Sequence, residues 1–146
     1  MNDFTKKLFE TVKKGSDSIE YQFPPPAVAD LDPTLLEYNP NKSIKWSFPI
    51  KERYNNPFGI TFGGYFAVFF DAVFGPFSGL TAGKPTTSLD LNVTFIKALR
   101  PADKNVIVES TIVSKSKTYL NLYGKAFTED GTLVATCTTR MLILNR

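Results

Sequence analysis

The sequence contains no histidine, and its 146 residues include a single cysteine, Cys137. Without His, a Ser/His/Asp triad, a Cys/His dyad or a His-ligated metal site cannot form within this chain. One Cys excludes an internal disulfide framework and a zinc site built from thiolates, and it fits a reducing compartment. These absences exclude much of the usual hydrolytic and metal chemistry.

The sequence also has no large excess of positive or negative charge. Lys and Arg together number 17 against 14 Asp and Glu, and the net charge of +3 is too small to indicate nucleic acid as a partner. The first 15 residues are charged and lack the apolar core of a secretory signal. We therefore predict a soluble, cytoplasmic protein.

Aromatic residues are plentiful by contrast, with 13 Phe and 6 Tyr beside one Trp. The hydrophobic share of 42% and the charged share of 21% are ordinary for a globular protein, and the length suits one domain. Many of the Phe fall between Phe58 and Phe77. This density predicts a large apolar interior or cavity.

Residues 1–42 are predicted to form an N-terminal helical extension packed on the body of the protein. Asp3 can cap a short amphipathic helix, in which apolar residues recur at every fourth position. A stiff proline-rich connector follows at 23–26. A second small helix is expected over Leu31–Tyr38, beginning near Pro33.

From Ser43 onward the pattern changes to an alternation of apolar and polar residues, which is typical of half-buried strands. A strong hairpin signal, Asp130-Gly131, separates the last two of them. The five predicted strands cover residues 43–50, 88–95, 106–112, 119–126 and 133–143.

Between the first and second strands, residues 63–74 are apolar on every side of a helical wheel, so this helix must be surrounded by protein or lipid. We expect Gly75-Pro76 to end it after about 12 residues, roughly 18 Å, which is too short for about 30 Å of hydrocarbon. Asp71 near its middle also argues against a membrane. We predict a helix wrapped by the sheet.

One strand, a buried helix and four more antiparallel strands is the order of elements in the hotdog fold. We therefore predict an α+β protein with a hotdog domain at 43–146, in which a curved antiparallel five-stranded sheet wraps around a central hydrophobic helix. A sheet of this size covers one helix only partly and has open edges. At least a dimer is expected.

Asp71 is the most informative candidate for chemistry. A carboxylate inside an apolar helix is costly unless it meets donors or water, and burial would raise its pKa toward the range of a general base. The alternative is a structural Asp bonded to a partner subunit or capping a loop. Gly63 and Gly64 begin the same helix, where unpaired N–H groups can form an oxyanion hole. Alternatively, the two glycines simply allow the helix to start close to a strand.

Weaker candidates surround this helix. Asn56 could orient water or hold a substrate carbonyl, and Ser88 could hydrogen-bond near the site, although both residue types are common in turns and strand ends. Lys115 and Lys117 lie in a predicted turn and could contact phosphates. The dense Phe set would suit an apolar acyl or aryl substrate as well as plain core packing.

Together, Asn56, the segment Gly59–Gly64, Asp71 and the strand Ser88–Phe95 resemble the hotdog thioesterases of the PaaI-like acyl-CoA thioesterase group. The resemblance extends roughly over residues 43–143. It implies that Asp71 activates water or attacks the thioester carbonyl, and that the Gly63 N–H polarises that carbonyl. Asn56 and Ser88 would assist.

The resemblance also implies where the substrate binds. The turn with Lys115, Ser116 and Lys117 would contact parts of coenzyme A, and Phe62, Gly64 and Phe66 would contact the substrate. The site would lie between the subunits of a homodimer, or of a dimer of dimers, with the glycines and the Asp from different subunits.

One position departs from the family pattern, because Phe62 stands where the motif Gly-x-x-His-Gly-Gly has His. We therefore expect a thioesterase for acyl-CoA or aryl-CoA that uses no metal or other cofactor. A non-catalytic module that binds acyl groups or acyl-CoA is the alternative, which Phe62 and the dense Phe set favour. A hotdog dehydratase is disfavoured, because that mechanism usually needs a His.

Overall fold

The computed structural model describes residues 24–145 and, before them, Asp3, Lys6, Lys7 and Glu10. The predicted N-terminal helix therefore lies largely outside the described residues. The described chain begins with a short helix, α2 (Pro26–Ala29), which starts at a proline and ends where the N–H of Asp30 donates to the carbonyl of Pro26. Proline suits this first helical position because its missing N–H would have no helical partner there.

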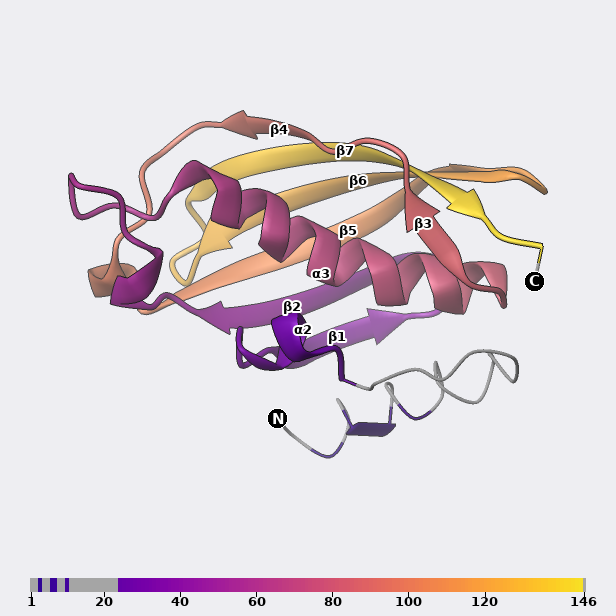
Figure 1. Ribbon diagram of the computed structural model, residues 1–146, viewed down its shortest axis with the longest axis horizontal. Helices are drawn as coiled ribbons and strands as arrows, with labels where there is room; N and C mark the ends of the chain where they lie inside the picture. Colours follow the sequence, from indigo (N-terminus) through magenta and orange to yellow (C-terminus); the bar gives the residue numbers. More distant parts are fainter. Residues whose placement is uncertain (1–2, 4–5, 8–9, 11–23, 146) are drawn as a thin grey trace.

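The strands form one antiparallel sheet in the order β1-β2-β5-β6-β7-β3, and β4 also pairs with β7. The sheet curls around the long helix α3 (Gly63–Ala82), which confirms the predicted hotdog architecture (Figure 1). Two 3₁₀ turns, η1 (Glu52–Tyr54) and η2 (Pro101–Asp103), lie in the connections. The strands are β1 (Thr34–Asn39), β2 (Ser43–Pro49), β3 (Thr86–Ser88), β4 (Asn92–Phe95), β5 (Asn105–Lys115), β6 (Tyr119–Thr128) and β7 (Leu133–Ile143).

The core lies between α3 and the inner face of this sheet. Every second residue of β2 and of β6 is buried, as the alternation predicts, and the polar residues between them face outward. Outward side chains of neighbouring strands carry opposite charges, and Lys45 forms ion pairs with both Glu37 and Glu109. The buried residues of α3 are Phe66, Phe69, Phe70, Val73, Phe74, Phe77, Ser78 and Thr81.

The predicted end of the helix at Gly75-Pro76 is wrong, because α3 continues through Pro76 to Ala82. Proline removes one backbone bond, but burial of Phe77 and Ser78 beyond it keeps the helix in place. The helix ends at Gly83, whose left-handed φ of 65° suits glycine. At 20 residues α3 is long and apolar enough to cross a membrane by length and composition, a property that it shares with core helices of soluble proteins.

Two other predicted elements need correction. Residues 34–39 form the strand β1 and not a helix, because pairing with β2 and burial of Leu35 outweigh local helical preference. The predicted strand at 88–95 is divided into β3 and β4. Between them, Asp90 is held to β7 by its side chain, which accepts the N–H of Arg140, and by its carbonyl, which accepts the hydroxyl of Thr139.

Gly124 on β6 is the position where the core tolerates no side chain. A Cβ there would lie 2.7 Å from Cδ1 of Phe70 and 2.9 Å from Cζ of Phe74, and both rings are fully buried. We expect Gly124→Ala to lower the free energy of unfolding by about 1–3 kcal/mol, since the rings have no space to move into. Urea denaturation measures this. Gly79→Ala in α3 is the control, because the nearest atom to its Cβ lies at 3.8 Å. Equal effects of the two substitutions would contradict this account of the core.

Candidate active site

The start of α3 is an uncapped helix N-terminus. Phe62 is the N-cap residue, and no side chain caps the helix. The N–H groups of Gly63 and Gly64 precede the first intrahelical bond, so the helix provides no acceptor for them. They carry the positive end of the helix dipole and can bind a carbonyl oxygen on which negative charge develops.

The loop before α3 holds this helix start in place. The N–H of Phe62 donates to the carbonyl of Tyr54 at 2.7 Å, and Asn55 and Thr61 form an isolated bridge. Asn56, one of the predicted site residues, shapes the same loop, because its side-chain oxygen accepts the N–H of Phe58 at 2.9 Å. That oxygen is therefore already engaged by the backbone.

Asp71 and Ser88 are brought together. Ser88, at the end of β3, donates its hydroxyl to Oδ1 of Asp71 at 2.9 Å. The predicted burial of Asp71 is wrong, however, because its side chain is exposed. It shares one face of α3 with Gly64 and Val68, which are also exposed, and the curled sheet covers the opposite face (Figure 1).

Within one chain, Gly63 and Asp71 are not brought together. They are eight residues apart on a continuous helix, which corresponds to about 12 Å along its axis. A single thioester carbonyl has to lie within about 3 Å of an oxyanion donor and within reach of the base. One chain alone therefore does not assemble the two groups around one substrate.

The predicted aromatic residues have different positions. Phe66 is buried with 4% exposure, whereas Phe62 is 56% exposed at the helix start. Phe95, which sequence reasoning did not single out, is 60% exposed and forms an edge-to-face contact with Phe66 at 5.7 Å between ring centroids. The alternation of apolar and polar residues in the predicted strand 88–95 places Phe95 with the inward-facing residues. It does not predict that Phe95 contacts the start of the helix.

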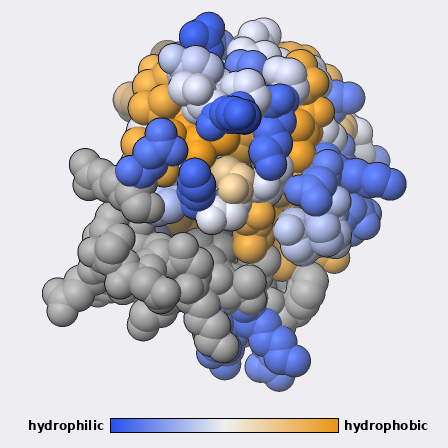
Figure 2. All heavy atoms as spheres, turned by 90° about the vertical axis from the view of Figure 1, so that its right-hand side faces the viewer, coloured by the Kyte–Doolittle hydropathy of each residue, from blue (hydrophilic) through white to orange (hydrophobic). Residues whose placement is uncertain are grey.

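The predicted phosphate-binding turn lies near the other end of α3. Lys115 donates its Nζ to the carbonyl of Thr81 at 2.9 Å, which places a positive charge at the negative end of the helix dipole. The hydroxyl oxygen of Ser116 accepts the N–H groups of Thr118 and Tyr119 and so shapes the turn. Lys117 is exposed. Figure 2 shows this end of the molecule, where hydrophobic and hydrophilic residues are interleaved.

Comparison with known proteins identifies the family. The family model of the thioesterase superfamily matches residues 58–135, which is more than half of the chain and includes Gly63, Asp71 and Ser88. The chain belongs to the thioesterase superfamily. No curated protein matches it.

Several solved structures share the fold of this chain. A thioesterase from Haemophilus influenzae is 20% identical with a TM-score of 0.74, and the match covers 82% of each chain. The E. coli PaaI protein, from the phenylacetic acid degradation operon, is 8% identical with a TM-score of 0.76, covering 84% of this chain and 86% of that one. A Streptococcus mutans protein bound to acetyl-CoA is 14% identical with a TM-score of 0.72, covering 87% and 95%.

The remaining titratable groups of this thioesterase-superfamily chain restrict the chemistry further. Burial raises the pKa of the Cys137 thiol to about 12, with smaller contributions from Asp71 and Asp90, so a reactive thiolate does not form there near neutral pH. Among the described residues, no group of three or more His, Cys, Asp or Glu could hold a metal ion.

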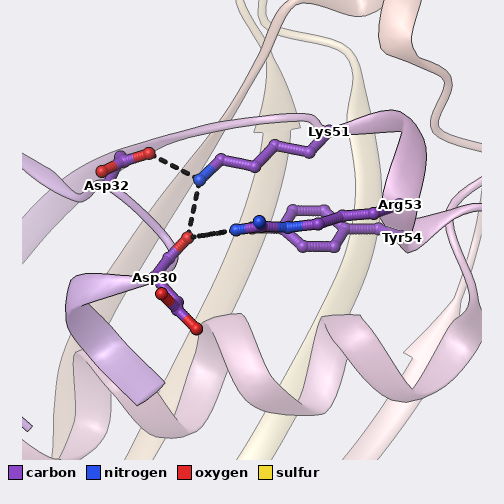
Figure 3. A network of polar contacts seen from close by, with 5 residues as sticks. All are labelled: Asp30, Asp32, Lys51, Arg53 and Tyr54. Carbon is purple, nitrogen blue, oxygen red and sulfur yellow. Dashed lines mark hydrogen bonds and ion pairs between the residues drawn. The ribbon is translucent and has the colours of Figure 1, made fainter. Parts of the chain in front are cut away.

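A network of polar contacts ties residues 30–32 to the loop before α3 (Figure 3). The carbonyl oxygen of Asp30 accepts hydrogen bonds from Lys51 at 2.6 Å and from Arg53 at 3.0 Å. Lys51 also pairs with the carboxylate of Asp32 at 2.5 Å. Tyr54, in the same turn, stacks on Tyr65 of α3 at 4.2 Å between centroids. The network therefore supports the turn from which the helix-start loop begins.

The pair of Asp32 and Lys51 gives a stability effect that depends on pH. The hydrogen bond from Lys51, and then its charge, lower the pKa of Asp32 in the folded protein. A lowered pKa stabilises the fold above the unfolded pKa of about 3.9, and this contribution is lost as the pH falls through the folded value. We expect Asp32→Asn to unfold at a lower urea concentration than wild type at pH 7.

The difference between the two proteins should shrink as the pH falls below the unfolded pKa of about 3.9, and it should vanish only below the lower pKa of Asp32 in the folded protein, where the wild-type carboxylate is neutral like Asn. Asn is a suitable replacement, because Asp32 has a φ of 49° and Asn tolerates the left-handed region. Denaturation curves from pH 7 to pH 3 measure the effect. A difference that stays constant over this range would argue against the ion pair.

Proposed function

We propose that this protein hydrolyses acyl-CoA or aryl-CoA thioesters with Asp71 as the catalytic carboxylate. The observation that carries the proposal is an exposed carboxylate on α3, oriented by Ser88, on the same face as the uncapped helix start at Gly63-Gly64. Membership in the thioesterase superfamily supports this reaction class. An additional metal or cofactor has no part in the proposed steps.

In the proposed reaction, Asp71 takes a proton from a water molecule whose oxygen attacks the thioester carbonyl carbon. The negative charge that develops on the carbonyl oxygen is stabilised by N–H groups at the start of α3. When the tetrahedral intermediate collapses, the carbon–sulfur bond breaks and the thiolate of coenzyme A leaves, to be protonated in turn. Direct attack by Asp71 would instead give a mixed anhydride, and hydrolysis in ¹⁸O-water under single-turnover conditions distinguishes the two routes.

The separation of about 12 Å along the helix leads to the proposal that each site is built from two subunits. If Asp71 of one chain lies beside Gly63 of the partner subunit, two-fold symmetry makes the second site identical and the two α3 helices antiparallel. The antiparallel arrangement also directs the turn at Lys115 toward the end where the partner's α3 begins. A pantetheine and nucleotide portion could then extend toward that turn.

The surface of the single chain supports a dimer on this side. Phe62, Val68 and Phe95 are each more than 40% exposed, although they are large and apolar. β4 pairs with β7 on one side, and no described strand pairs with its other edge. Exposed apolar residues next to an unpaired strand edge are typical of an interaction surface. The oligomeric state and the cytoplasmic location stay predictions.

The first test is Asp71→Asn, which keeps the size of the side chain and removes the base. We expect kcat for a reactive acyl-CoA to fall by about 10²–10⁴-fold, the usual contribution of general-base catalysis. Ser88→Ala should lower it by about 10- to 100-fold, since a hydrogen bond to a charged group contributes about 1.5–3 kcal/mol. Thiol release followed by Ellman's reagent measures both, and thermal unfolding checks the fold.

Unchanged activity of Asp71→Asn would remove the proposed role of this carboxylate. The alternative function is a module that binds acyl-CoA without hydrolysing it, which is favoured by Phe62, an apolar residue without hydrogen-bonding groups at the helix start. Stabilisation of the wild type by acyl-CoA thioesters, without thiol release from any of them, would support this alternative and contradict hydrolysis.

The second test asks whether the site is shared between subunits. Gly63→Val should block the helix start, because a Cβ at Gly63 already lies 3.2 Å from the ring of Phe95. When the Gly63→Val and Asp71→Asn proteins are unfolded and refolded together, the mixture should regain about a quarter of wild-type activity. Half of a random set of dimers contain one chain of each variant, and each of these dimers has one intact site out of two. If both variants are inactive alone and the refolded mixture is inactive too, the proposal that each site is built from two subunits is wrong.

A further inference from the structure

The ring of Phe95 lies directly against the start of α3. If Gly63 carried a Cβ, its three nearest atoms would all belong to this ring, at 3.2, 3.4 and 3.8 Å. Phe95 ends the strand β4 and pairs with Ala135 of β7, so the sheet fixes its backbone. A Cβ at position 63 would require the ring to move by a few tenths of an ångström.

A second ring is in contact with Phe95. Phe66, which is 4% exposed, contacts Phe95 edge to face. Deeper in the core, the rings of Phe70 and Phe74 lie so close to β6 that only glycine fits at position 124. The two outer rings therefore lie in contact with each other where the start of α3 meets β4.

We propose that Phe95 is a specificity-determining residue that restricts the protein to acyl groups with short chains. This inference rests on the proposed function, because it takes the N–H of Gly63 as the group that binds the thioester carbonyl. A carbonyl oxygen held there lies about 3 Å from the N–H, so the first carbons of the acyl group meet the ring of Phe95. A short acyl chain fits over the exposed face of the ring.

A longer chain has no route inward past Phe95 and Phe66, so its additional methylene groups gain no contact with the apolar core. Replacement of Phe95 by Ala removes this ring and leaves space beside Gly63, next to Phe66. The longer chain then gains apolar contact, whereas a short chain loses its contact with the ring. Both changes shift the selectivity from short toward longer acyl chains.

The experiment compares kcat/KM for acetyl-, butyryl-, hexanoyl- and octanoyl-CoA in the wild type and in Phe95→Ala. We expect the ratio of octanoyl-CoA to butyryl-CoA to rise by about tenfold or more, which is the discrimination that even one methylene can give in an apolar pocket. Phe58→Ala is the matched control, because this ring is 85% exposed and the ratio should not change. Phe95→Leu should shift the ratio in the same direction by a smaller factor.

A binding measurement separates this inference from the proposed reaction. S-butyl-CoA and S-octyl-CoA are thioethers that cannot be hydrolysed, and calorimetry gives their dissociation constants for the Asp71→Asn protein with and without Phe95→Ala. Tighter binding of S-octyl-CoA after Phe95→Ala supports the role of Phe95, even if the wild type hydrolyses nothing. Light scattering on each variant shows whether the dimer persists, and Phe95→Leu replaces Phe95→Ala if it does not.

A selectivity ratio and dissociation constants that stay the same in a folded dimer with the substitution would overturn the inference. Loss of activity in Asp71→Asn, together with unchanged selectivity in Phe95→Ala, would keep the proposed hydrolysis and reject the role of Phe95. A change of oligomeric state in both Phe95 variants, with no change in selectivity, would make Phe95 a subunit contact only and reject the inference as well.

Discussion

The packing of α3 against only one side of a curled sheet is the constraint on which the rest of the structure depends. Phe69, Phe70 and Phe74 are buried against the strands, and β6 accommodates two of these rings by having glycine at position 124. The sheet cannot also enclose the other side of the helix. An apolar helix in this fold therefore keeps one open face, and the polar residue Asp71 lies on that face.

The same constraint explains the form of the candidate site. The helix start offers unpaired N–H groups, Ser88 of the adjacent strand orients the carboxylate, and the helix itself keeps the two apart by about 12 Å. A rigid helix cannot shorten this distance. In the dimer that we propose, a second copy of the chain with its α3 antiparallel to the first would bring the two groups together and cover the exposed apolar residues.

Much of this could be predicted from the sequence, because alternation and an apolar helix are local patterns. The hotdog order, the hairpin at Asp130-Gly131 and the closeness of Ser88 to Asp71 agree with the structure. Local preference predicts a helix where β1 lies, because it does not include the pairing of this strand with β2. The exposure of Asp71 and the contact of Phe95 with Gly63 depend on which side of the helix the sheet covers. A local sequence pattern does not predict that side.

The most direct measurement is a crystal structure of the Asp71→Asn protein with an acyl-CoA bound. We expect the thioester carbonyl oxygen to lie about 3 Å from an N–H at the start of α3 in one subunit, with the side chain at position 71 of the other subunit next to the carbonyl carbon. A thioester that contacts the helix start and position 71 of the same chain, or neither of them, would contradict the account.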